Sequence, residues 1–270
     1  MRVGDRLTSV GKVDLLSSFG ELRSELAQTP AGQRIGLRWY RGANRVYRVS
    51  PPLATLPMES VPDSLVRYDS IELDGIGQRL IVSEPVAGAK ALVLFLQGIG
   101  CESLDYWFDT DATIKSLIDG WARAGYATAR LEKRGGGDSE GPGCDALNFT
   151  DERRGYLAAI SRLADQGFRG RIFLFGHGLG GIIAPLVSTD AVAGIMVYGT
   201  ASVPWYDHVM SRFQREDQLA GMADDLRSER QRLRSEFQQG LLFEGETPAV
   251  LKARIPGVTA LEDVRLADDT

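Results

Sequence analysis

Four short apolar segments alternate with helical patterns along the chain, and this alternation constrains the fold more than any other feature. The segments are KALVLFLQG, YATARLE, RIFLFG and AGIMVYG, at residues 90–98, 126–132, 171–176 and 193–199. Strands this apolar are typical of a sheet covered on both faces. The helical patterns lie between them, at residues 110–124, 151–166 and 179–187. The alternation predicts an α/β fold with a parallel sheet in three layers.

The segments on either side of this alternation complete the predicted core. Residues 66–73 and 78–84, VRYDSIEL and QRLIVSE, alternate like antiparallel strands. A polar helical run from Asp207 to about Gln239 predicts an amphipathic lid, because apolar residues recur at steps of three and four. These residues are Leu219, Met222, Leu226, Leu233, Phe237 and Leu241. We therefore divide this part of the chain into a core at 65–202, a helical lid at 203–255 and a tail at 256–270.

The first 64 residues have a different pattern, which predicts a small α+β unit at 1–50 and a proline-rich linker at 51–64. A strand at 5–10, a helix at 17–28 and a hairpin formed by 33–42 and 44–50 follow in that order. This order resembles the second half of a PDZ domain of the bacterial protease type. The peptide-gripping half of such a domain would precede residue 1, so the resemblance implies a packing role for this partial unit rather than peptide capture.

Three glycine-containing loops follow the ends of predicted strands. They are LQGIGCES at 96–103, RLEKRGGGDSEGPGC at 130–144 and FGHGLGG at 175–181. In open parallel sheets, ligands bind at the carboxyl ends of the strands. Gly98 and Gly100 allow backbone amides to turn toward a ligand, as in an oxyanion hole. Gly176 and Gly180 permit a tight corner between a strand and a helix.

Together, in this order and spacing, the three loops resemble the α/β-hydrolase superfamily, and most closely its serine esterases and acyl-peptidase-like hydrolases. The resemblance implies a three-layer α/β-hydrolase fold with a helical lid and descent from a hydrolase of ester or amide bonds. It places Gly178 at the position of the nucleophile and assigns the oxyanion amides to Leu179 and to Ile99 or Gly98. The candidate residues for the surrounding pocket are Gln97, Cys101, Glu132, His177, Trp205 and His208. For Glu132, a structural ion pair with Arg130 under the loop is favoured over a catalytic role.

The catalytic positions of that superfamily are not filled in the expected way. Gly178 has no side-chain oxygen and cannot attack a carbonyl group. The sequence has two histidines. His177 adjoins the nucleophile position, where its side chain is expected to point away from the reaction centre, and His208 precedes the usual place of the base in the order nucleophile, acid, base.

We therefore predict a catalytically incompetent chain, as a truncated reading frame would produce. One alternative is an active serine esterase or peptidase in a longer native form with serine at position 178. A second alternative is a non-enzymatic module that binds a peptide or acyl ligand.

The two cysteines, Cys101 and Cys144, both follow predicted strands at the same edge of the sheet. They are therefore expected to lie close enough for a disulfide or a thiol pair. A cysteine nucleophile is a further alternative, although no histidine partner is visible. The remaining interpretation is that both are small, partly buried apolar side chains.

Charge and hydropathy exclude several classes of partner. A net charge of −5 and a pI near 5.2 argue against nucleic acid as a partner. The longest apolar runs are too short to span a bilayer, and residues 1–10 lack a signal-peptide core. With two cysteines, these features predict a cytoplasmic protein, provided that Met1 is the native start. No cofactor or metal is predicted, and the expected ligand is a small acyl or peptide molecule.

We find no further buried strand after residues 193–199. This strand is therefore expected at an exposed sheet edge, where unpaired amide and carbonyl groups favour dimerisation, aggregation or covering by the tail.

Overall fold

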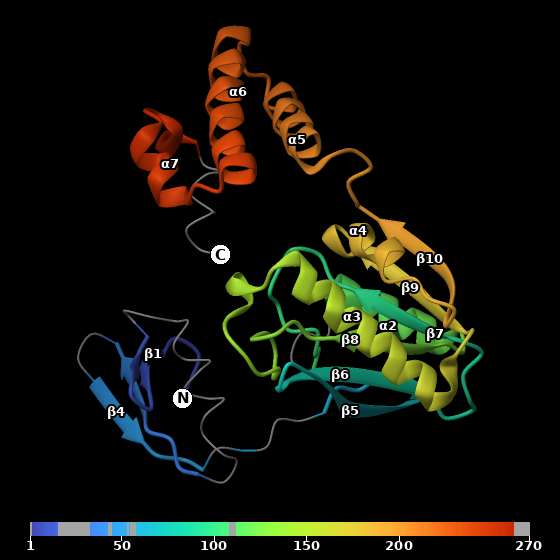
Figure 1. The fold of residues 1–270 in the computed structure, drawn as a ribbon. Coiled ribbons are helices and arrows are strands. Elements are labelled where there is room, and N and C mark those ends of the chain that lie inside the picture. The colour runs from blue at the N-terminus through green and yellow to red at the C-terminus, as the bar shows by residue number, and fades with distance from the viewer. Residues whose placement is uncertain are drawn as a thin grey trace. The chain divides into compact units, whose positions relative to one another are not determined.

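A computed structural model describes residues 2–15, 33–42, 45–52, 54, 58–107 and 112–261 (Figure 1). The chain divides into two compact units, one formed by residues 1–60 with 105–115 and the other by residues 61–104 with 116–270. Each unit is described by itself below. The helix predicted at 17–28 and the end of the tail, 262–270, lie outside the described residues.

The first unit contains an antiparallel sheet with the strand order β2-β1-β3-β4. Its strands are β1 (Arg6–Val10), β2 (Val13–Asp14), β3 (Leu37–Arg41) and β4 (Arg45–Val49). The predicted hairpin is confirmed by the pairing of β3 with β4, in which Trp39 stacks on Tyr47 with ring centroids 5.5 Å apart. Arg41 and Asp5 form an ion pair at 2.7 Å that joins β3 to the turn before β1.

The second unit contains a six-stranded mixed sheet with the order β10-β9-β7-β8-β6-β5. Its strands are β5 (Ser64–Leu73), β6 (Ile76–Pro85), β7 (Leu92–Leu96), β8 (Ala127–Leu131), β9 (Ile172–His177) and β10 (Val192–Tyr198). The first two are antiparallel, as predicted, and β6 also pairs antiparallel with β8. The strands β8, β7, β9 and β10 pair in parallel, so their carboxyl ends lie at one edge.

Helices cover both faces of this sheet, which gives the predicted three layers (Figure 1). The helices are α2 (Thr113–Arg123), α3 (Phe149–Leu163) and α4 (Leu179–Leu186). Buried side chains of α3 and α4 pack on one face, against Leu94 of β7 and Leu174 of β9. On the other face, Trp121 of α2 contacts Phe175, with ring centroids 5.2 Å apart. The fold class predicted from the sequence is therefore confirmed for this unit.

The strand β10 differs from the prediction of a strand buried on both faces. Its second half is exposed, and Tyr198 reaches 69% exposure. The reason is its position, because β10 is the last strand in the sheet order and, among the described residues, pairs with β9 alone. Between residues 199 and 261, all of them described, the chain forms helices and turns and no strand. The predicted edge position is thus confirmed, while dimerisation through it stays a prediction.

The segment after β10 forms three helices, α5 (Trp205–Leu219), α6 (Asp224–Gln239) and α7 (Pro248–Arg254). The single helical run predicted from Asp207 to Gln239 is interrupted, because Gly221 adopts a positive φ of 66°. Leu233 and Phe237 are buried with residues of α7, as an amphipathic pattern predicts. Leu219 and Leu226 are exposed, so including them in the apolar stripe was wrong. They flank the interruption, where the helical period is lost.

Short helical turns complete the described structure. There are 3-10 turns at Cys144–Ala146 and Val258–Ala260, and π turns at Ala164–Phe168 and Gly240–Glu244. Within the described ranges, the helices are too short or too polar to cross a membrane.

An ion pair between β5 and α3 makes the stability of the second unit depend on pH. Asp69 accepts hydrogen bonds from Arg162 at 3.0 and 3.1 Å and from Gln166. The Arg162 guanidinium lowers the pKa of Asp69 to about 2. Because the folded-state pKa is depressed, this stabilisation is present above the unfolded-state pKa near 4 and is lost as pH falls toward 2.

Replacing Asp69 by asparagine is therefore expected to lower the free energy of unfolding by about 1–2 kcal/mol at pH 7, allowing for the partial exposure of Arg162. The difference in unfolding free energy between Asp69→Asn and the wild type should shrink as pH falls from 4 to 2. Urea denaturation at several pH values measures it. Asp190→Asn, which breaks the exposed pair with Arg169, should change stability by less than about 0.5 kcal/mol. Equal effects of the two variants would contradict the prediction.

Candidate functional site

The candidate site is built around the corner between β9 and α4. Gly178 occupies this corner with φ 54° and ψ −118°, a conformation that favours glycine. Its amide donates to the carbonyl oxygen of Tyr198 at 3.1 Å, and its own carbonyl oxygen accepts from the Gly181 amide at 3.1 Å. The strand therefore reverses into a helix within one residue, as expected for a nucleophile turn.

Crowding explains the other glycines of the corner. A Cβ atom on Gly176 would lie 2.5 Å from the carbonyl oxygen of Gly180, and a Cβ on Gly181 would lie 2.6 Å from Thr200 Oγ1. A Cβ on Gly178, in contrast, would lie 3.6 Å from Gly98 Cα, which is ordinary van der Waals contact. Position 178 thus has room for a side chain, although its positive φ would strain one.

The loop after β7, residues 97–104, faces this position through Gly98, and we call it the β7 loop. Gln97 is buried, with its amide donating to Tyr156 Oη at 2.9 Å and its side-chain Nε2 donating to Glu102 O at 2.9 Å. Ile99 is 71% exposed. Leu179 is the first residue of α4, so its amide has no partner within the helix. The assignment of the oxyanion amides to Leu179 and to Ile99 or Gly98 stays a prediction.

Glu132 begins the loop after β8, residues 132–144, which we call the β8 loop. Its carboxylate is 1% exposed and accepts from Arg79 Nε at 3.0 Å, the Asp138 amide at 2.8 Å and the Leu104 amide at 3.1 Å. It also accepts from Ser103 Oγ. Four donors from three segments therefore converge on Glu132, which joins the β7 loop to the β8 loop.

The glycine run of the β8 loop follows from this arrangement. A Cβ on Gly137, whose φ is 53°, would overlap the Glu132 carboxylate, and a Cβ on Gly135 would overlap the backbone of Pro142. The loop can wrap closely around the carboxylate only because these side chains are absent. Glu132 is thus fully engaged in holding the loops, which is the structural role expected of it, but the ion pair that the structure gives it is with Arg79, while Arg130 donates to the carbonyl oxygen of Leu104.

A second buried charge pair lies beneath the β7 loop. Lys133 Nζ donates to the carbonyl oxygen of Gly98 at 2.6 Å and lies 3.2 Å from Glu152 Oε1. Burial raises the pKa of Glu152, and the nearby Lys133 ammonium opposes that shift. Glu152 and Tyr156 lie one turn apart on α3.

Lys133, Glu152 and Tyr156 were not among the site residues predicted from the sequence. The available signal was the spacing of Glu152 and Tyr156, which places both on the face of α3 that carries Ala159 and Ile160.

Cys101 of the β7 loop and Cys144 of the β8 loop form a disulfide, with their Cα atoms 5.8 Å apart. Of the alternatives left open by the sequence, the structure therefore selects the disulfide. The cysteine-nucleophile alternative was wrong for this form of the protein, since neither sulfur is a free thiol.

The two histidines lie in different elements. The His177 ring stacks on Tyr198 with centroids 6.0 Å apart, and a Cβ on Gly98 would lie 3.4 Å from His177 Nδ1. His208 lies in the first turn of α5 beside Trp205, with ring centroids 5.7 Å apart. The structure thus places Gln97 and His177 beside the corner, while the contacts of Cys101 and Glu132 join the β7 loop to the β8 loop. That Trp205 and His208 belong to the same site stays a prediction.

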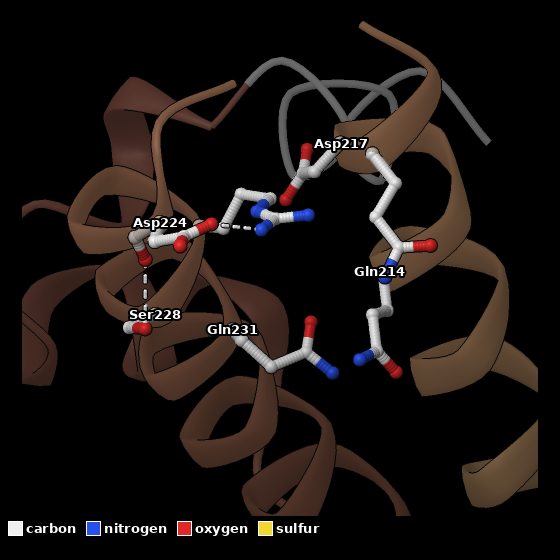
Figure 2. A pocket seen from close by; sticks show the side chains of 7 residues that line it. Gln214, Asp217, Asp224, Ser228 and Gln231 are labelled. Atoms are coloured by element: carbon white, nitrogen blue, oxygen red, sulfur yellow. Dashed lines mark hydrogen bonds and ion pairs between the residues drawn. The ribbon is translucent and has the colours of Figure 1, made fainter. Parts of the chain in front are cut away.

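A separate polar cavity of about 250 Å³ lies between α5 and α6 (Figure 2). Figure 2 shows Gln214 and Gln231 pointing toward one another from the two helices. One side is formed by Asp217, which pairs with Arg234 at 2.6 Å and with Arg230 at 3.2 Å. The other residues that line the cavity are Gln218, Asp224, Arg227 and Ser228. None of the site residues predicted from the sequence lines this cavity.

The chain is similar to several solved structures at low sequence identity. VinJ is 18% identical over 75% of this chain and 59% of its own, with a TM-score of 0.45. A cold-adapted esterase from an Arctic intertidal metagenomic library is 16% identical over 52% of this chain and 62% of its own, with a TM-score of 0.40. The thermostable carboxylesterase EstE1 from a metagenomic library is 17% identical over 57% of this chain and 54% of its own, with a TM-score of 0.42.

The chain therefore spans less than two thirds of the length of each of these proteins. A search of curated protein sequences gave no match.

The family model for serine aminopeptidases of the S33 type matches residues 88–229, just over half of the chain. The matched segment runs from β7 into α6 and includes both loops and the corner at Gly178. The relationship to α/β-hydrolases inferred from the three loops is confirmed by this match, which does not include the N-terminal unit that resembles part of a PDZ domain. The chain belongs to the serine aminopeptidase S33 family of α/β-hydrolases.

Proposed function

We propose that this chain is a non-hydrolytic member of its family, which keeps the framework of the site without cleaving ester or amide bonds. Gly178 at the corner between β9 and α4 is the observation that carries this proposal. Serine hydrolases attack the substrate with a side-chain oxygen at this position. In well-studied triads, loss of a triad member leaves a rate only about 10³–10⁴-fold above that in water.

The rest of the chain supports the same conclusion. Cys101 and Cys144 are held in a disulfide. A working base needs a hydrogen bond of about 2.6–3.2 Å to its nucleophile. The contacts that the structure gives for the two histidine rings are with aromatic side chains, His177 with Tyr198 and His208 with Trp205. The competing hypothesis is an active hydrolase in a longer form with serine at position 178.

A second candidate function is the binding of a small acyl or peptide ligand without turnover. It is favoured by the space at position 178, where a Cβ would meet Gly98 Cα at 3.6 Å. The Leu179 amide beside this space has no partner within α4 and could donate to an acyl oxygen. Calorimetry with N-acetylated dipeptides and short fatty acids tests this candidate, and the absence of saturable heat would count against it.

The proposal predicts no hydrolysis of a nitrophenyl ester by the wild-type chain above the rate in buffer. Gly178→Ser should restore no turnover at enzyme rates, because a serine hydroxyl without a base remains a weak nucleophile. The variant should lose about 1–3 kcal/mol of unfolding free energy, since φ is 54° at this position. Initial rates and urea denaturation measure the two effects.

Gly178→Ala is the matched control, because it carries the same backbone strain without a hydroxyl group. The two variants should have equal stability and equal background rates. Turnover near 1 s⁻¹ or faster by Gly178→Ser alone, within about the usual range for enzymes, would show that the chain contains a working base and would overturn the proposal.

A further inference from the structure

We propose that Cys101 and Cys144 form a reversible thiol–disulfide site, and that its redox state determines whether residues 99–101 of the β7 loop, which follow the Gly98 that faces Gly178, are held in place. The site joins two loops whose cysteines are 43 residues apart in the sequence. Both cysteines are half-buried rather than enclosed in the core. The inference deepens the proposed function, since it concerns the same site, but its test does not depend on catalysis.

The ends of the β7 loop are firmly held without the disulfide. At its start, the Gln97 amide donates to Tyr156 Oη at 2.9 Å. At its other end, the Leu104 amide donates to the buried Glu132 carboxylate at 3.1 Å. Breaking the disulfide leaves both of these contacts in place, so any release is confined to the residues between them.

The middle of the loop, residues 98–101, has fewer attachments. Within the described part of the chain, its polar and covalent attachments are the Lys133 hydrogen bond to Gly98 O and the disulfide at Cys101. Ile99 is 71% exposed and contributes little packing. Gly98 and Gly100 have large conformational freedom that such attachments must restrict. Removing the covalent attachment leaves residues 99–101 without a polar tether.

The β8 loop is anchored independently of the disulfide. The Gly135 amide donates to Glu140 O at 2.9 Å, the Glu140 amide donates to Gly77 O at 2.8 Å, and Ser139 Oγ accepts from the Arg79 amide at 2.9 Å. These bonds join the loop to itself and to β6. Cys144 itself is held by the turn that it begins, where its carbonyl oxygen accepts from the Leu147 amide at 3.0 Å. The β8 loop is therefore the fixed side of the cross-link, and the β7 loop is the side that reduction releases.

The reaction is exchange with a dithiol reductant. One reductant thiolate attacks a cysteine sulfur, the S–S bond breaks, and the other cysteine leaves with the electron pair and takes up a proton. The second reductant thiol then attacks the mixed disulfide and releases the first cysteine as a thiol. The reductant ends as a disulfide and the protein ends with two thiols. The reverse exchange with an oxidised dithiol restores the cross-link.

Backbone ¹⁵N relaxation of the whole chain tests the proposal, with dithiothreitol as the reductant. In the oxidised protein, the order parameters of Ile99 and Gly100 should be near 0.85, and after reduction they should fall below about 0.6. Those of Gly136 and Ser139 in the β8 loop and Leu174 in β9 should stay near 0.85 in both states. Alkylation with mass spectrometry should count no free thiol before reduction and two after it.

The double variant Cys101→Ser with Cys144→Ser is the matched control. It should behave like the reduced protein and should not respond to dithiothreitol. Unchanged order parameters at Ile99 and Gly100 after reduction would overturn the proposal. So would equal loosening of Ser139, which would mean that the disulfide stabilises the unit as a whole, or two free thiols after treatment with oxidised glutathione. None of these results bears on whether Gly178→Ser hydrolyses an ester, so the two proposals can fail separately.

Discussion

Gly180→Ala is expected to destabilise the second unit by more than about 3 kcal/mol, and to leave part of the protein unfolded at 37 °C. A Cβ on Gly180 would overlap the carbonyl oxygen of Leu96 and would lie 2.6 Å from its carbonyl carbon and 2.7 Å from the carbonyl oxygen of Gln97. These are backbone atoms at the end of β7, a buried central strand, and they cannot move aside as a side chain can. To fit the methyl group, α4 must move away from the sheet and lose packing at Ile183 and Ala184.

Two control variants separate crowding from other consequences of replacing glycine. Gly120→Ala lies on the exposed side of α2 with no atom within 4 Å of the new Cβ, and it should stabilise the protein by about 0.5–1 kcal/mol. Gly178→Ala has room for the methyl group but a positive φ, and it should cost about 1–3 kcal/mol. Urea denaturation ranks the three variants. If Gly180→Ala lowered the free energy of unfolding no more than Gly178→Ala does, the expected clash of the new methyl group with β7 would be contradicted.

The core of the second unit could be predicted because its strands and helices carry strong local patterns. The apolar run of β7 predicts a strand buried on both faces, and its residues are indeed buried. The same reasoning failed for the exposed strand β10. A run of apolar residues shows that a segment favours a sheet, but the position of the strand within that sheet depends on which strands pair.

The candidate site could be predicted in part, for a comparable reason. Glycines mark tight corners in a sequence, so the turn at Gly178 and the β7 loop could be located from residue types and spacing alone. The contacts of Lys133 with Gly98 and Glu152 join segments far apart in the sequence. No local pattern reports such contacts, because they depend on which strands and helices lie side by side.

The contacts of Glu132 also depend on segments that are distant in the sequence. Its place directly after a buried strand made it a candidate for the pocket, since carboxylates at that edge often act on ligands. In the structure, its carboxylate oxygens accept hydrogen bonds from four donors of the protein itself. The glycine-rich sequence that follows was a signal for this enclosure, because Gly137 leaves space for the carboxylate.

Glu132→Gln is therefore expected to reduce the free energy of unfolding by about 3–5 kcal/mol, a loss typical when one partner of a buried ion pair is removed. The substitution leaves Arg79 facing a neutral amide. It also replaces an acceptor by an NH₂ group that must face donors from Ser103, Leu104, Asp138 or Arg79. Because those donors belong to both loops, the contacts between the β7 loop and the β8 loop around residue 132 should loosen, while the Cys101–Cys144 disulfide still joins the two loops. Urea denaturation measures the loss.

Asp138→Asn is the matched control, because Asp138 pairs with the same Arg79 guanidinium but is about half exposed. The Asp138→Asn substitution should lower the free energy of unfolding by no more than about 1 kcal/mol, since water can replace the lost partner at this half-exposed position. The contrast between the two variants separates the buried carboxylate with its four donors from an exposed carboxylate that shares the same arginine. Equal losses would mean that Arg79, rather than the enclosure of Glu132, determines the order of these loops. A Glu132→Gln protein as stable as wild type would mean that the β7 loop is held by Lys133 and the disulfide instead.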